Sequence, residues 1–485
     1  MLHVGIVGAG ISGLVTAKVC LQYHYRVTLL EKAADIGGVW QPDRRYFSVS
    51  TQTPGNQYAF SDFPMPDDYP DWPSGEQIFS YVTAYADHFQ LRPHIRFNTT
   101  VMATRYTANT WQADVHDAGN QTDTTLHFDF LIICTGAFHA PHIPVFPGMQ
   151  SFIDQGGQIR HSTEINTAAM LEHKSVAVVG FAKSAMDIAT LAADVAKDCT
   201  LIYRQVRWAM PLFLFGKFNL KYLFLSRFGE VFVDRPYSKG LRQLAATIKK
   251  PFAWCQWRLI EWVLKTQFNL KGCNMIPADP IEEQQNCSLG IAPPDFYAKV
   301  RNGQITGIHT EIARFEGRTV CLQNGTSITP DIVIFGTGFH RQLPFLEAKY
   351  QQLLWGEEKI YHLYRNILHP DIPQLAFVGF NTSYFTPLTS ELAANWIARY
   401  IQGTLILPPV ADIQKETERM VTWQKNRSHV TSTQDGTCIA PLNITHLDQL
   451  MRDMGVSRKV NGTPWRIFRP IYPKDYHALL HRKEK

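Results

Sequence analysis

The chain has 485 residues, of which 45% are hydrophobic and 18% charged, and its net charge is +5. The length predicts two or three domains, the composition excludes a disordered chain, and the small net charge gives no reason to expect a nucleic acid partner. The eight cysteines form no Cys-x-x-Cys pair, which argues against a zinc site and a dithiol centre. Since no uncharged apolar run reaches the roughly 18 residues of a spanning helix, we expect a cytoplasmic protein.

The chain opens with a glycine-rich turn between two apolar strands. The strands are predicted at 3–7 and 26–30, with a helix at 14–22 between them. The residues that carry the motif are Gly8, Gly10 and Gly13 in the turn and Glu31 after the second strand. This order is the fingerprint of dinucleotide binding. The first glycine permits a tight turn, the second lets backbone approach a pyrophosphate, and the third lets the helix pack closely. The acid would accept hydrogen bonds from a ribose, and the helix N-terminus would face the phosphates.

A second copy of this pattern is predicted at 175–204. Its turn contains Gly180, Lys183 and Ser184, and its second strand ends at Arg204. A base at that point can pair with a 2′-phosphate, which an acid would repel, so we expect NADP(H) rather than NAD(H) here. Arg207 adds to the positive charge. Ala182 replaces the middle glycine, and its methyl group can weaken pyrophosphate binding, so a module that no longer binds a nucleotide stays an alternative.

Further motifs make the chain resemble the flavin-containing monooxygenases from Val4 to about Tyr476. The matching segments are Gly8–Gly13 with Glu31 and Lys32, Gly37-Gly38-Val39-Trp40, Thr51-Gln52-Thr53-Pro54, Phe60-Ser61-Asp62-Phe63-Pro64, Cys134-Thr135-Gly136 and Phe335-Gly336-Thr337-Gly338-Phe339. The identifying motif FxGxxxHxxx(Y/F) is degenerate, because Gly157 and His161 match while Gln155 and Ile165 replace its two aromatic ends. A Gln-Thr-Pro at 52–54, where animal-type members carry Asn, is similar to the plant branch that includes pipecolate N-hydroxylating enzymes.

The resemblance implies an α/β fold with two Rossmann-like domains and the cofactors FAD and NADPH. The NADP-binding domain, 161–330, would be inserted into a discontinuous FAD-binding domain made of 1–160 and 331–485. The cofactor-binding residues implied are Gly8, Gly10, Gly13, Glu31, Lys32, Gly38, Trp40, Thr51, Gln52, Asp62, Thr135, Gly136, Gly180, Lys183, Ser184, Arg204 and Gly338.

The resemblance also implies an NADPH- and O2-dependent monooxygenase of the N,N-dimethylaniline monooxygenase type. Reduced flavin would form a C4a-hydroperoxide that oxygenates a soft nucleophile, a nitrogen or sulfur of a small molecule. Gln52 is the candidate catalytic residue, as a polar contact beside the flavin or the oxygen; the alternative is that it only caps the turn 51–54. Baeyer–Villiger oxygenation of a ketone, and an FAD-binding membrane-associated protein without turnover, are the rival functions. No CxxxxC follows the first module, which argues against a disulfide reductase.

The segment 208–271 has an unusual composition. It contains 11 basic and 3 acidic residues, a net charge of +8, and 14 aromatic residues. Such a segment can be a buried insertion that covers a substrate tunnel, a helix on a membrane surface, or an oligomer interface.

Farther on, Thr386 and Pro387 predict the N-cap and first residue of a helix to Tyr400. Its buried face is expected to contain Leu392, Trp396 and Ile397. In the family, such a helix would point its N-terminal end at the flavin ring; the alternative is an ordinary surface helix that packs on the core.

Overall fold

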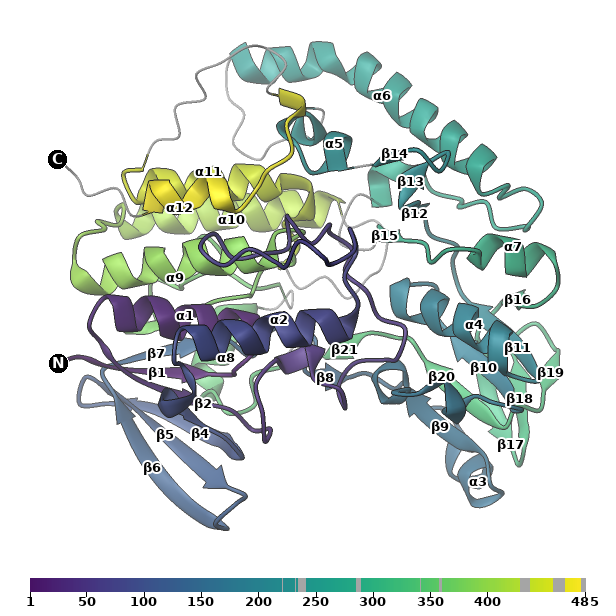
Figure 1. Cartoon of the computed structure of the whole chain (residues 1–485), viewed down its shortest axis with the longest axis horizontal. Helices are drawn as coiled ribbons and strands as arrows, with labels where there is room; N and C mark the ends of the chain where they lie inside the picture. The colour runs from purple at the N-terminus through teal and green to yellow at the C-terminus, as the bar shows by residue number, and fades with distance from the viewer. Residues whose placement is uncertain are drawn as a thin grey trace.

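The computed structural model describes residues 1–219, 221–231, 233, 241–284, 289–340, 342–356, 360–427, 437–456 and 467–480. Two parallel five-stranded sheets form its framework, one on the left and one on the right of Figure 1. The first sheet has the order β22-β7-β1-β2-β3. Its strands are β1 (His3–Val7), β2 (Arg26–Leu30), β3 (Ile95–Arg96), β7 (Phe130–Ile133) and β22 (Leu375–Phe377). Helix α1 (Ile11–Gln22) follows β1 after the glycine turn, as the sequence predicts.

The second sheet has the order β16-β11-β10-β20-β9. Its strands are β9 (Gln158–His161), β10 (Ser175–Val179), β11 (Asp198–Tyr203), β16 (Thr306–His309) and β20 (Ile332–Phe335). Helix α4 (Lys183–Val195) follows β10. The predicted α/β fold with two Rossmann-like units is confirmed. The predicted domain boundaries at 160/161 and 330/331 do not coincide with the edges of this sheet. Strand β9 spans the first boundary, and β20, which belongs to the same sheet, lies after the second.

Smaller elements surround the two sheets. Two β-meanders are formed by β4 (Thr99–Thr107), β5 (Thr110–Asp117) and β6 (Thr122–Phe128), and by β17 (Ile312–Glu316), β18 (Thr319–Leu322) and β19 (Ser327–Ile328). The further helices include α2 (Gly75–His88), α3 (Met149–Asp154), α7 (Phe296–Arg301), α8 (Ala348–Trp355), α10 (Val410–Arg427), α11 (Asn443–Asp453) and α12 (Lys474–Leu480). The short strands β8 (Ala140–Pro141) and β21 (Phe339–His340) pair antiparallel, and they bring together the two chain crossings between the sheets.

Helix α9 (Thr386–Gln402) packs along α1, and its predicted apolar face is buried in the core of the first module. The predicted N-cap is wrong by one residue. Phe385 occupies the cap position, and the Thr386 hydroxyl donates to the carbonyl of Ser383 (2.8 Å) instead of accepting from the first turn. The cysteines Cys20, Cys134 and Cys199 are buried free thiols, whereas Cys438 is disulfide-bonded, which its sequence spacing does not predict.

The segment 208–271 crosses from one module to the other. It contains the short strands β12 (Ala209–Met210), β13 (Phe213–Leu214) and β14 (Phe218–Asn219), and the helices α5 (Lys221–Phe224) and α6 (Leu241–Gln267). Strand β12 pairs with β15 (Gly290–Ile291). Leu225 belongs to the apolar core of the first module, whereas Trp257 and Leu264 of α6 belong to that of the second. The segment is therefore an insertion anchored in both cores.

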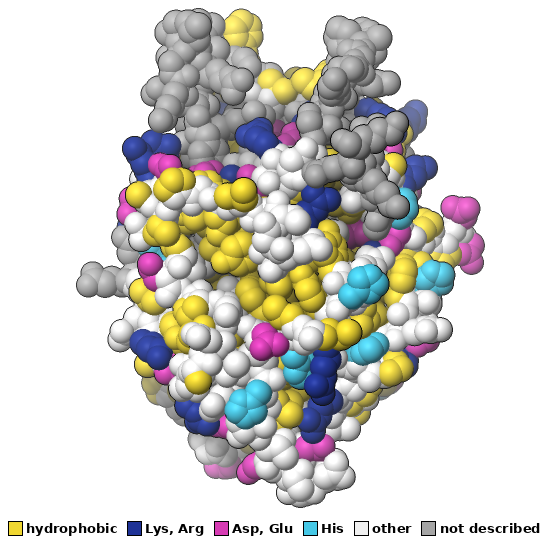
Figure 2. All heavy atoms as spheres, turned by 90° about the vertical axis from the view of Figure 1, so that its left-hand side faces the viewer, with side chains coloured by type: hydrophobic (Ala, Val, Ile, Leu, Met, Phe, Trp, Pro, Cys, Tyr) yellow, Lys and Arg dark blue, Asp and Glu magenta, His cyan; other side chains and the backbone are white. Residues whose placement is uncertain are grey.

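On the face at the left of Figure 1, the described residues form no block of one charge. In Figure 2, basic, acidic and histidine side chains are interspersed around a central apolar area on that face. Within the described residues, no helix combines the length and apolar character needed to cross a membrane.

Candidate functional site

The turn after β1 is shaped by its glycines. Gly8 has φ +103°, and a Cβ atom there would lie 2.8 Å from the Cys134 carbonyl oxygen. A Cβ atom on Gly13 would lie 1.8 Å from the Gly8 carbonyl oxygen, so α1 can approach the turn this closely only with glycine. Gly10 differs, because a Cβ atom there would meet only the Gly38 Cα, at 3.7 Å. The space in front of Gly10 is therefore open, as a turn that admits a pyrophosphate requires.

The acid after β2 is fixed against this turn. The buried carboxylate of Glu31 accepts hydrogen bonds from the N–H groups of Ala9 (2.7 Å) and Ala33 (3.0 Å). The neighbouring Lys32 is exposed and has no hydrogen-bond or ion-pair partner among the described residues. Glu31 therefore lies beside the glycines, where the motif predicts a ribose, while the ammonium of Lys32 remains available to a ligand.

The Gly-Gly-Val-Trp turn packs onto the glycine turn. The N–H of Gly37 donates to the Ala9 carbonyl (3.0 Å), and a Cβ atom on Gly38 would lie 3.1 Å from the Gly10 Cα. Trp40 follows with its ring edge-on to Tyr58, at 6.0 Å between ring centroids. Gly38 and Trp40 thus lie close to Gly10 and Glu31. From the sequence, this proximity could be predicted only through the family resemblance.

Two threonines of the predicted site have buried hydroxyl oxygens without a hydrogen-bond partner in the described structure. They are Thr51 and Thr135. An unpaired buried hydroxyl costs about 1–3 kcal/mol, and native proteins normally satisfy such groups. Thr135 lies directly beside the glycine turn, since a Cβ atom on Gly8 would be 3.4 Å from its Cα. A bound dinucleotide fits here, because it offers the hydrogen-bonding groups that the protein does not supply.

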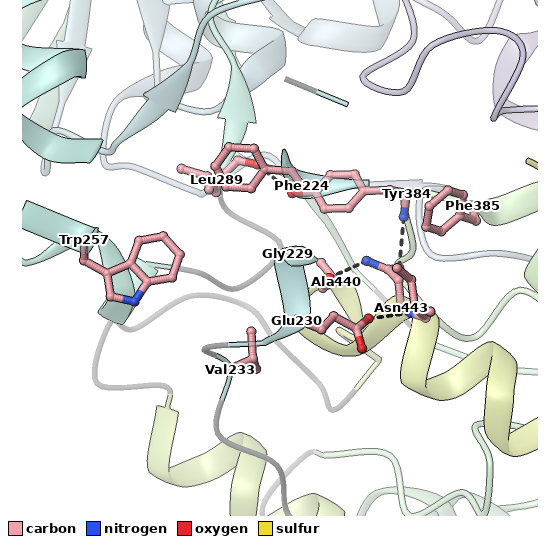
Figure 3. A pocket seen from close by; sticks show the side chains of 11 residues that line it. Phe224, Gly229, Glu230, Val233, Trp257, Leu289, Tyr384, Phe385, Ala440 and Asn443 are labelled. Carbon is pink, nitrogen blue, oxygen red and sulfur yellow. Dashed lines mark hydrogen bonds between the residues drawn. The ribbon is translucent and has the colours of Figure 1, made fainter. Parts of the chain in front are cut away.

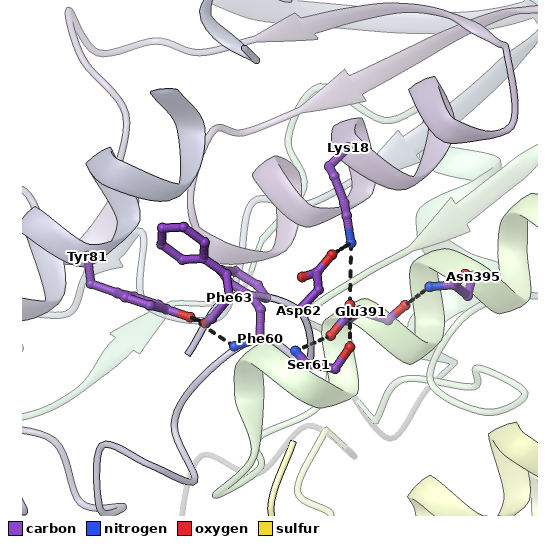
Figure 4. Close-up of polar contacts among 8 residues, drawn as sticks. All are labelled: Lys18, Phe60, Ser61, Asp62, Phe63, Tyr81, Glu391 and Asn395. Atoms are coloured by element: carbon purple, nitrogen blue, oxygen red, sulfur yellow. Dashed lines mark hydrogen bonds and ion pairs between the residues drawn. The ribbon is translucent and has the colours of Figure 1, made fainter. Parts of the chain in front are cut away.

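Asp62 lies in a buried ionic network (Figure 4). Its Oδ2 is 2.5 Å from the ammonium of Lys18 in α1, and that ammonium is 3.4 Å from Oε1 of Glu391 in α9. Glu391 also accepts hydrogen bonds from the N–H (2.8 Å) and hydroxyl (2.9 Å) of Ser61. Burial raises the pKa of Glu391, an effect that Lys18 opposes. Asp62 therefore serves to join the loop 60–64 to α1 and α9, and its predicted contact with a cofactor stays a prediction.

The second glycine turn repeats the geometry of the first with one change. Gly180 has φ +125°, and a Cβ atom there would lie 2.7 Å from the Gly336 carbonyl oxygen. Ala182, in place of the middle glycine, is the exposed N-cap of α4. Ser184, in the first turn of α4, is half-buried, and its hydroxyl has no partner among the described residues. The turn can thus still present its backbone and the start of α4 to a ligand.

Lys183 does not extend freely from this turn. Its ammonium is 2.6 Å from Oδ1 of the buried Asp187, whose Oδ2 accepts a hydrogen bond from the Tyr46 hydroxyl (2.7 Å). Burial raises the pKa of Asp187, while Lys183 lowers it. Tyr46 follows the Gly37–Trp40 turn in sequence and packs in the core of the second module, so the three side chains join this part of the first module to the second nucleotide turn. A contact of Lys183 with a phosphate would require this pair to separate.

Arg204 and Arg207 form an unneutralised pair of cations after β11. Arg204 is exposed, Arg207 is half-buried, and neither side chain has a hydrogen-bond or ion-pair partner among the described residues. The pKa of Arg207 is lowered by burial and, to a smaller extent, by the charge of Arg204. Two guanidinium groups without an acid attract anions, and the contact of Arg204 with a 2′-phosphate stays a prediction.

Gln52 lies where the two modules meet. Its side-chain oxygen accepts a hydrogen bond from the N–H of Ile291 in β15 (3.1 Å), so the contact reaches across to the second module instead of capping its own turn. The next hydroxyl, on Thr53, donates to the carbonyl of Tyr384 before α9 (2.8 Å). The exposed amide nitrogen of Gln52 has no partner among the described residues.

The two chain crossings place Gly136 and Gly338 beside open space. They have φ +70° and +85°, and a Cβ atom on either would have no atom within 4 Å. The motif histidine His161, at the end of β9, is hydrogen-bonded through Nε2 to the Gly338 carbonyl (3.0 Å). The degenerate motif is thus in contact with the second crossing.

A small, partly open pocket with a cavity volume of about 50 Å³ lies next to this junction (Figure 3). Its lining comes from the insertion, the segment before β15, the start of α9 and the region of α11. The lining residues are Phe224, Gly229, Glu230, Val233, Trp257, Leu289, Tyr384, Phe385, Ala440, Asn443 and Ile444. The Tyr384 hydroxyl donates to the Leu289 carbonyl (3.4 Å), and burial raises the pKa of Tyr384 to about 12.

Sequence reasoning missed most of this pocket. Glu230 accepts a hydrogen bond from the N–H of Thr445 (3.0 Å) at the start of α11, and Asn443 accepts from the Ser383 hydroxyl (2.6 Å). In the described chain each of these contacts joins two residues more than fifty positions apart in the sequence, so no local spacing pattern predicts them. The composition of 208–271, rich in aromatic residues, was the one available signal, and it did not indicate which side chains face inward.

Comparisons with known proteins agree with this geometry. A family model described as flavin-binding monooxygenase-like matches residues 2–462. A probable flavin-containing monooxygenase 1 of Arabidopsis thaliana is 27% identical, covering 99% of this chain and 97% of the relative. Dimethylaniline monooxygenase (N-oxide-forming) 2 of Rattus norvegicus is 28% identical over 93% of this chain and 82% of the relative. A crystal structure of OTEMO, in complex with FAD and NADP, has a TM-score of 0.71 at 18% identity, covering 93% of this chain and 98% of that chain.

The chain belongs to the flavin-binding monooxygenase-like family. The prediction of an FAD-dependent monooxygenase is therefore confirmed, and a plant protein stands among the relatives that match over nearly the whole length. The likeness to OTEMO confirms the two-domain fold.

Proposed function

We propose that this enzyme uses NADPH and O2 to oxygenate a soft nucleophile, a nitrogen or sulfur atom of a small molecule. Bound FAD would supply the oxygen-transfer chemistry as its C4a-hydroperoxide. The observation that carries the proposal is the junction at Gln52, where the first module, β15 and the start of α9 meet beside a largely apolar pocket. The name of the rat relative, which is N-oxide-forming, supports nitrogen as the atom oxygenated.

The proposal assigns FAD to the first module and NADPH to the second. The open space at Gly10, the fixed carboxylate of Glu31 and the unsatisfied hydroxyl of Thr135 support FAD at the first turn. The unpaired guanidinium groups of Arg204 and Arg207 support NADPH over NADH at the second. The proposed division into an FAD domain interrupted by an NADP domain follows from this assignment.

The pocket is proposed as the substrate site. Aromatic and aliphatic side chains make up most of its lining, and such walls exclude water from the reacting atoms. Exclusion of water matters because an oxygenated flavin that meets water releases its oxygen as H2O2. Gln52, whose amide nitrogen is free to donate, is proposed as the polar contact between the flavin, the nicotinamide and this pocket.

The test measures products and coupling together. Purified enzyme is supplied with NADPH, O2 and either N,N-dimethylaniline or cyclohexanone, and products are examined for the gain of one oxygen atom. Oxygenation of the amine alone supports the proposal. Ester formation from the ketone alone would assign a Baeyer–Villiger reaction instead.

The role of Gln52 is tested on the same assay. Gln52→Ala should leave FAD content and flavin reduction by NADPH nearly intact and raise the H2O2 released per NADPH consumed, whereas Gln52→Asn should be milder. Asn56→Ala, at an exposed position of the same loop, is the control and should not change the coupling. If Gln52→Ala couples NADPH to product as tightly as the parent, Gln52 only joins the loop to β15.

A further inference from the structure

A buried group of three side chains lies at the second nucleotide turn. Lys183 is the first residue of α4, and its ammonium is 2.6 Å from Oδ1 and 2.5 Å from Oδ2 of Asp187, one turn along the helix. The Tyr46 hydroxyl donates to the same Oδ2 (2.7 Å). The side chain of Asp187 is 3% exposed and that of Lys183 is 15% exposed. The carboxylate is thus sheltered from water, and Lys183 balances its charge within the protein.

The position of Lys183 on α4 is unfavourable for a cation. The start of a helix carries a partial positive charge, and a lysine placed four residues before its acid has the weaker of the two possible orientations of such a pair. The buried carboxylate of Asp187 therefore holds the ammonium here and draws it back along the helix. An anion at the start of α4 would attract the ammonium in the opposite direction.

Two donors share the carboxylate of Asp187. Burial raises the pKa of Asp187, and the charge of Lys183 lowers it. Burial and, to a smaller extent, Asp187 raise the pKa of Tyr46, so its hydroxyl keeps its proton and donates. A hydrogen bond to a buried carboxylate stabilises the charged form. The carboxylate therefore depends less on Lys183 while Tyr46 is bonded to it.

The Lys183 side chain begins beside the junction of the two modules. A Cβ atom on Gly290, in β15, would lie 3.7 Å from the Cβ of Lys183 and 3.2 Å from the side-chain oxygen of Gln52. The lysine thus lies between the nucleotide turn and the residue that we propose as the polar contact to the flavin. The partner that holds its ammonium consequently affects the place where the two cofactors would meet.

We propose that Asp187 competes with the phosphates of the nicotinamide cofactor for Lys183, and that Tyr46 moderates this competition. The inference rests on the proposed binding of NADPH by the second module. Without nucleotide, the ammonium is held by Asp187. A pyrophosphate at the turn must draw it away, so the nucleotide binds less tightly than it would to a free Lys183. Asp187 and Tyr46 act through Lys183 and are therefore positioning residues.

The experiment measures the Kd of NADP+ and of NAD+ for the FAD-containing enzyme by isothermal titration calorimetry. Asp187→Asn keeps an acceptor for the Tyr46 hydroxyl but removes the charge that holds Lys183. Both nucleotides should then bind at least about tenfold more tightly. Tyr46→Phe should have the opposite effect, because the carboxylate then relies on Lys183 alone. We expect binding to weaken at least about twofold, which is the loss of one hydrogen bond.

A second pair of variants tests whether Asp187 acts through Lys183. Lys183→Met and Lys183→Met/Asp187→Asn should bind each nucleotide equally, within about twofold, because the lysine for which Asp187 competes is absent. If Asp187→Asn tightens binding as much without Lys183 as with it, the carboxylate repels phosphate directly and the proposal is wrong. Asp194→Asn is the matched control. It removes a carboxylate of the same helix that pairs with Lys299 (2.5 Å), and it should leave both Kd values unchanged.

The signs of the two single changes separate this inference from a structural role. Weaker binding in both Asp187→Asn and Tyr46→Phe would mean that the three side chains only support the fold, and the proposal would be overturned. Tyr46→Phe keeps both charges in place, so it decides the matter if Asp187→Asn does not retain FAD; unchanged or tighter binding would then contradict the inference. A parent enzyme that binds neither nucleotide would instead refute the proposed function and this inference together.

Discussion

The difference between Gly10 and Gly13 yields a prediction that separates cofactor binding from folding. In Gly13→Ala the new methyl group would lie 1.8 Å from the Gly8 carbonyl oxygen, so α1 must move away from the turn. Overpacking of this kind costs about 1–3 kcal/mol or more in folding free energy. In Gly10→Ala the new methyl group would meet only the Gly38 Cα, at 3.7 Å, which is ordinary contact. Gly10 also has an extended backbone, φ −79° and ψ −171°, that alanine adopts without strain.

Gly10→Ala should therefore fold as stably as the parent without FAD and still bind FAD poorly. Displacing the pyrophosphate by one methyl group should weaken FAD binding at least tenfold, or about 1.4 kcal/mol. The assay titrates flavin-free protein with FAD by flavin fluorescence and records thermal melting of both flavin-free variants. Gly13→Ala should lower the melting temperature in the absence of FAD. If Gly10→Ala binds FAD within twofold of the parent, the pyrophosphate does not approach this turn, and the assignment of the first module fails.

Three further predictions follow from charges in the structure. Arg204→Ala should raise the KM for NADPH far more than that for NADH, since a charged contact to phosphate is worth about 1.5–3 kcal/mol; equal changes for both cofactors would remove Arg204 from the 2′-phosphate site. Lys18→Met should cost about 3–5 kcal/mol in chemical denaturation, because it leaves the buried carboxylates of Asp62 and Glu391 without their cation; an unchanged midpoint would contradict this. Burial lowers the pKa of His446 to about 3 from 6.5. Between these two pH values His446 is neutral in the folded chain and protonated in the unfolded chain. The free energy of unfolding should therefore fall by about 1.4 kcal/mol per pH unit as the pH drops below 6.5. His446→Gln should make the unfolding free energy less dependent on pH in that range, and an unchanged slope would refute the assignment.

Local pattern predicted the parts of the fold that local chemistry determines. The turn at Gly8–Gly13, the acid Glu31 directly after β2 and the base Arg204 directly after β11 were all recognisable, because each needs only its own neighbours. The N-cap was predicted at Thr386 from the residue type and was wrong. The path of the preceding loop instead lets the Thr386 hydroxyl donate to the Ser383 carbonyl, and Phe385 occupies the cap position. Lys183 is predicted to bind the cofactor, and the sequence does not reveal that its ammonium pairs with Asp187, which also bonds to Tyr46. Its contact with the cofactor stays a prediction.

The pocket was beyond local pattern because both modules and the insertion build it together. Arg227 forms two hydrogen bonds to Asp448 in α11 (2.6 and 2.8 Å), and the nearby Leu225 is part of the core of the first module. Trp257, from the same insertion, is anchored in the core of the second module and faces the same pocket. One wall of the pocket is thus anchored in the core of each module. A rotation of one nucleotide module against the other would therefore have to change the pocket or strain the insertion.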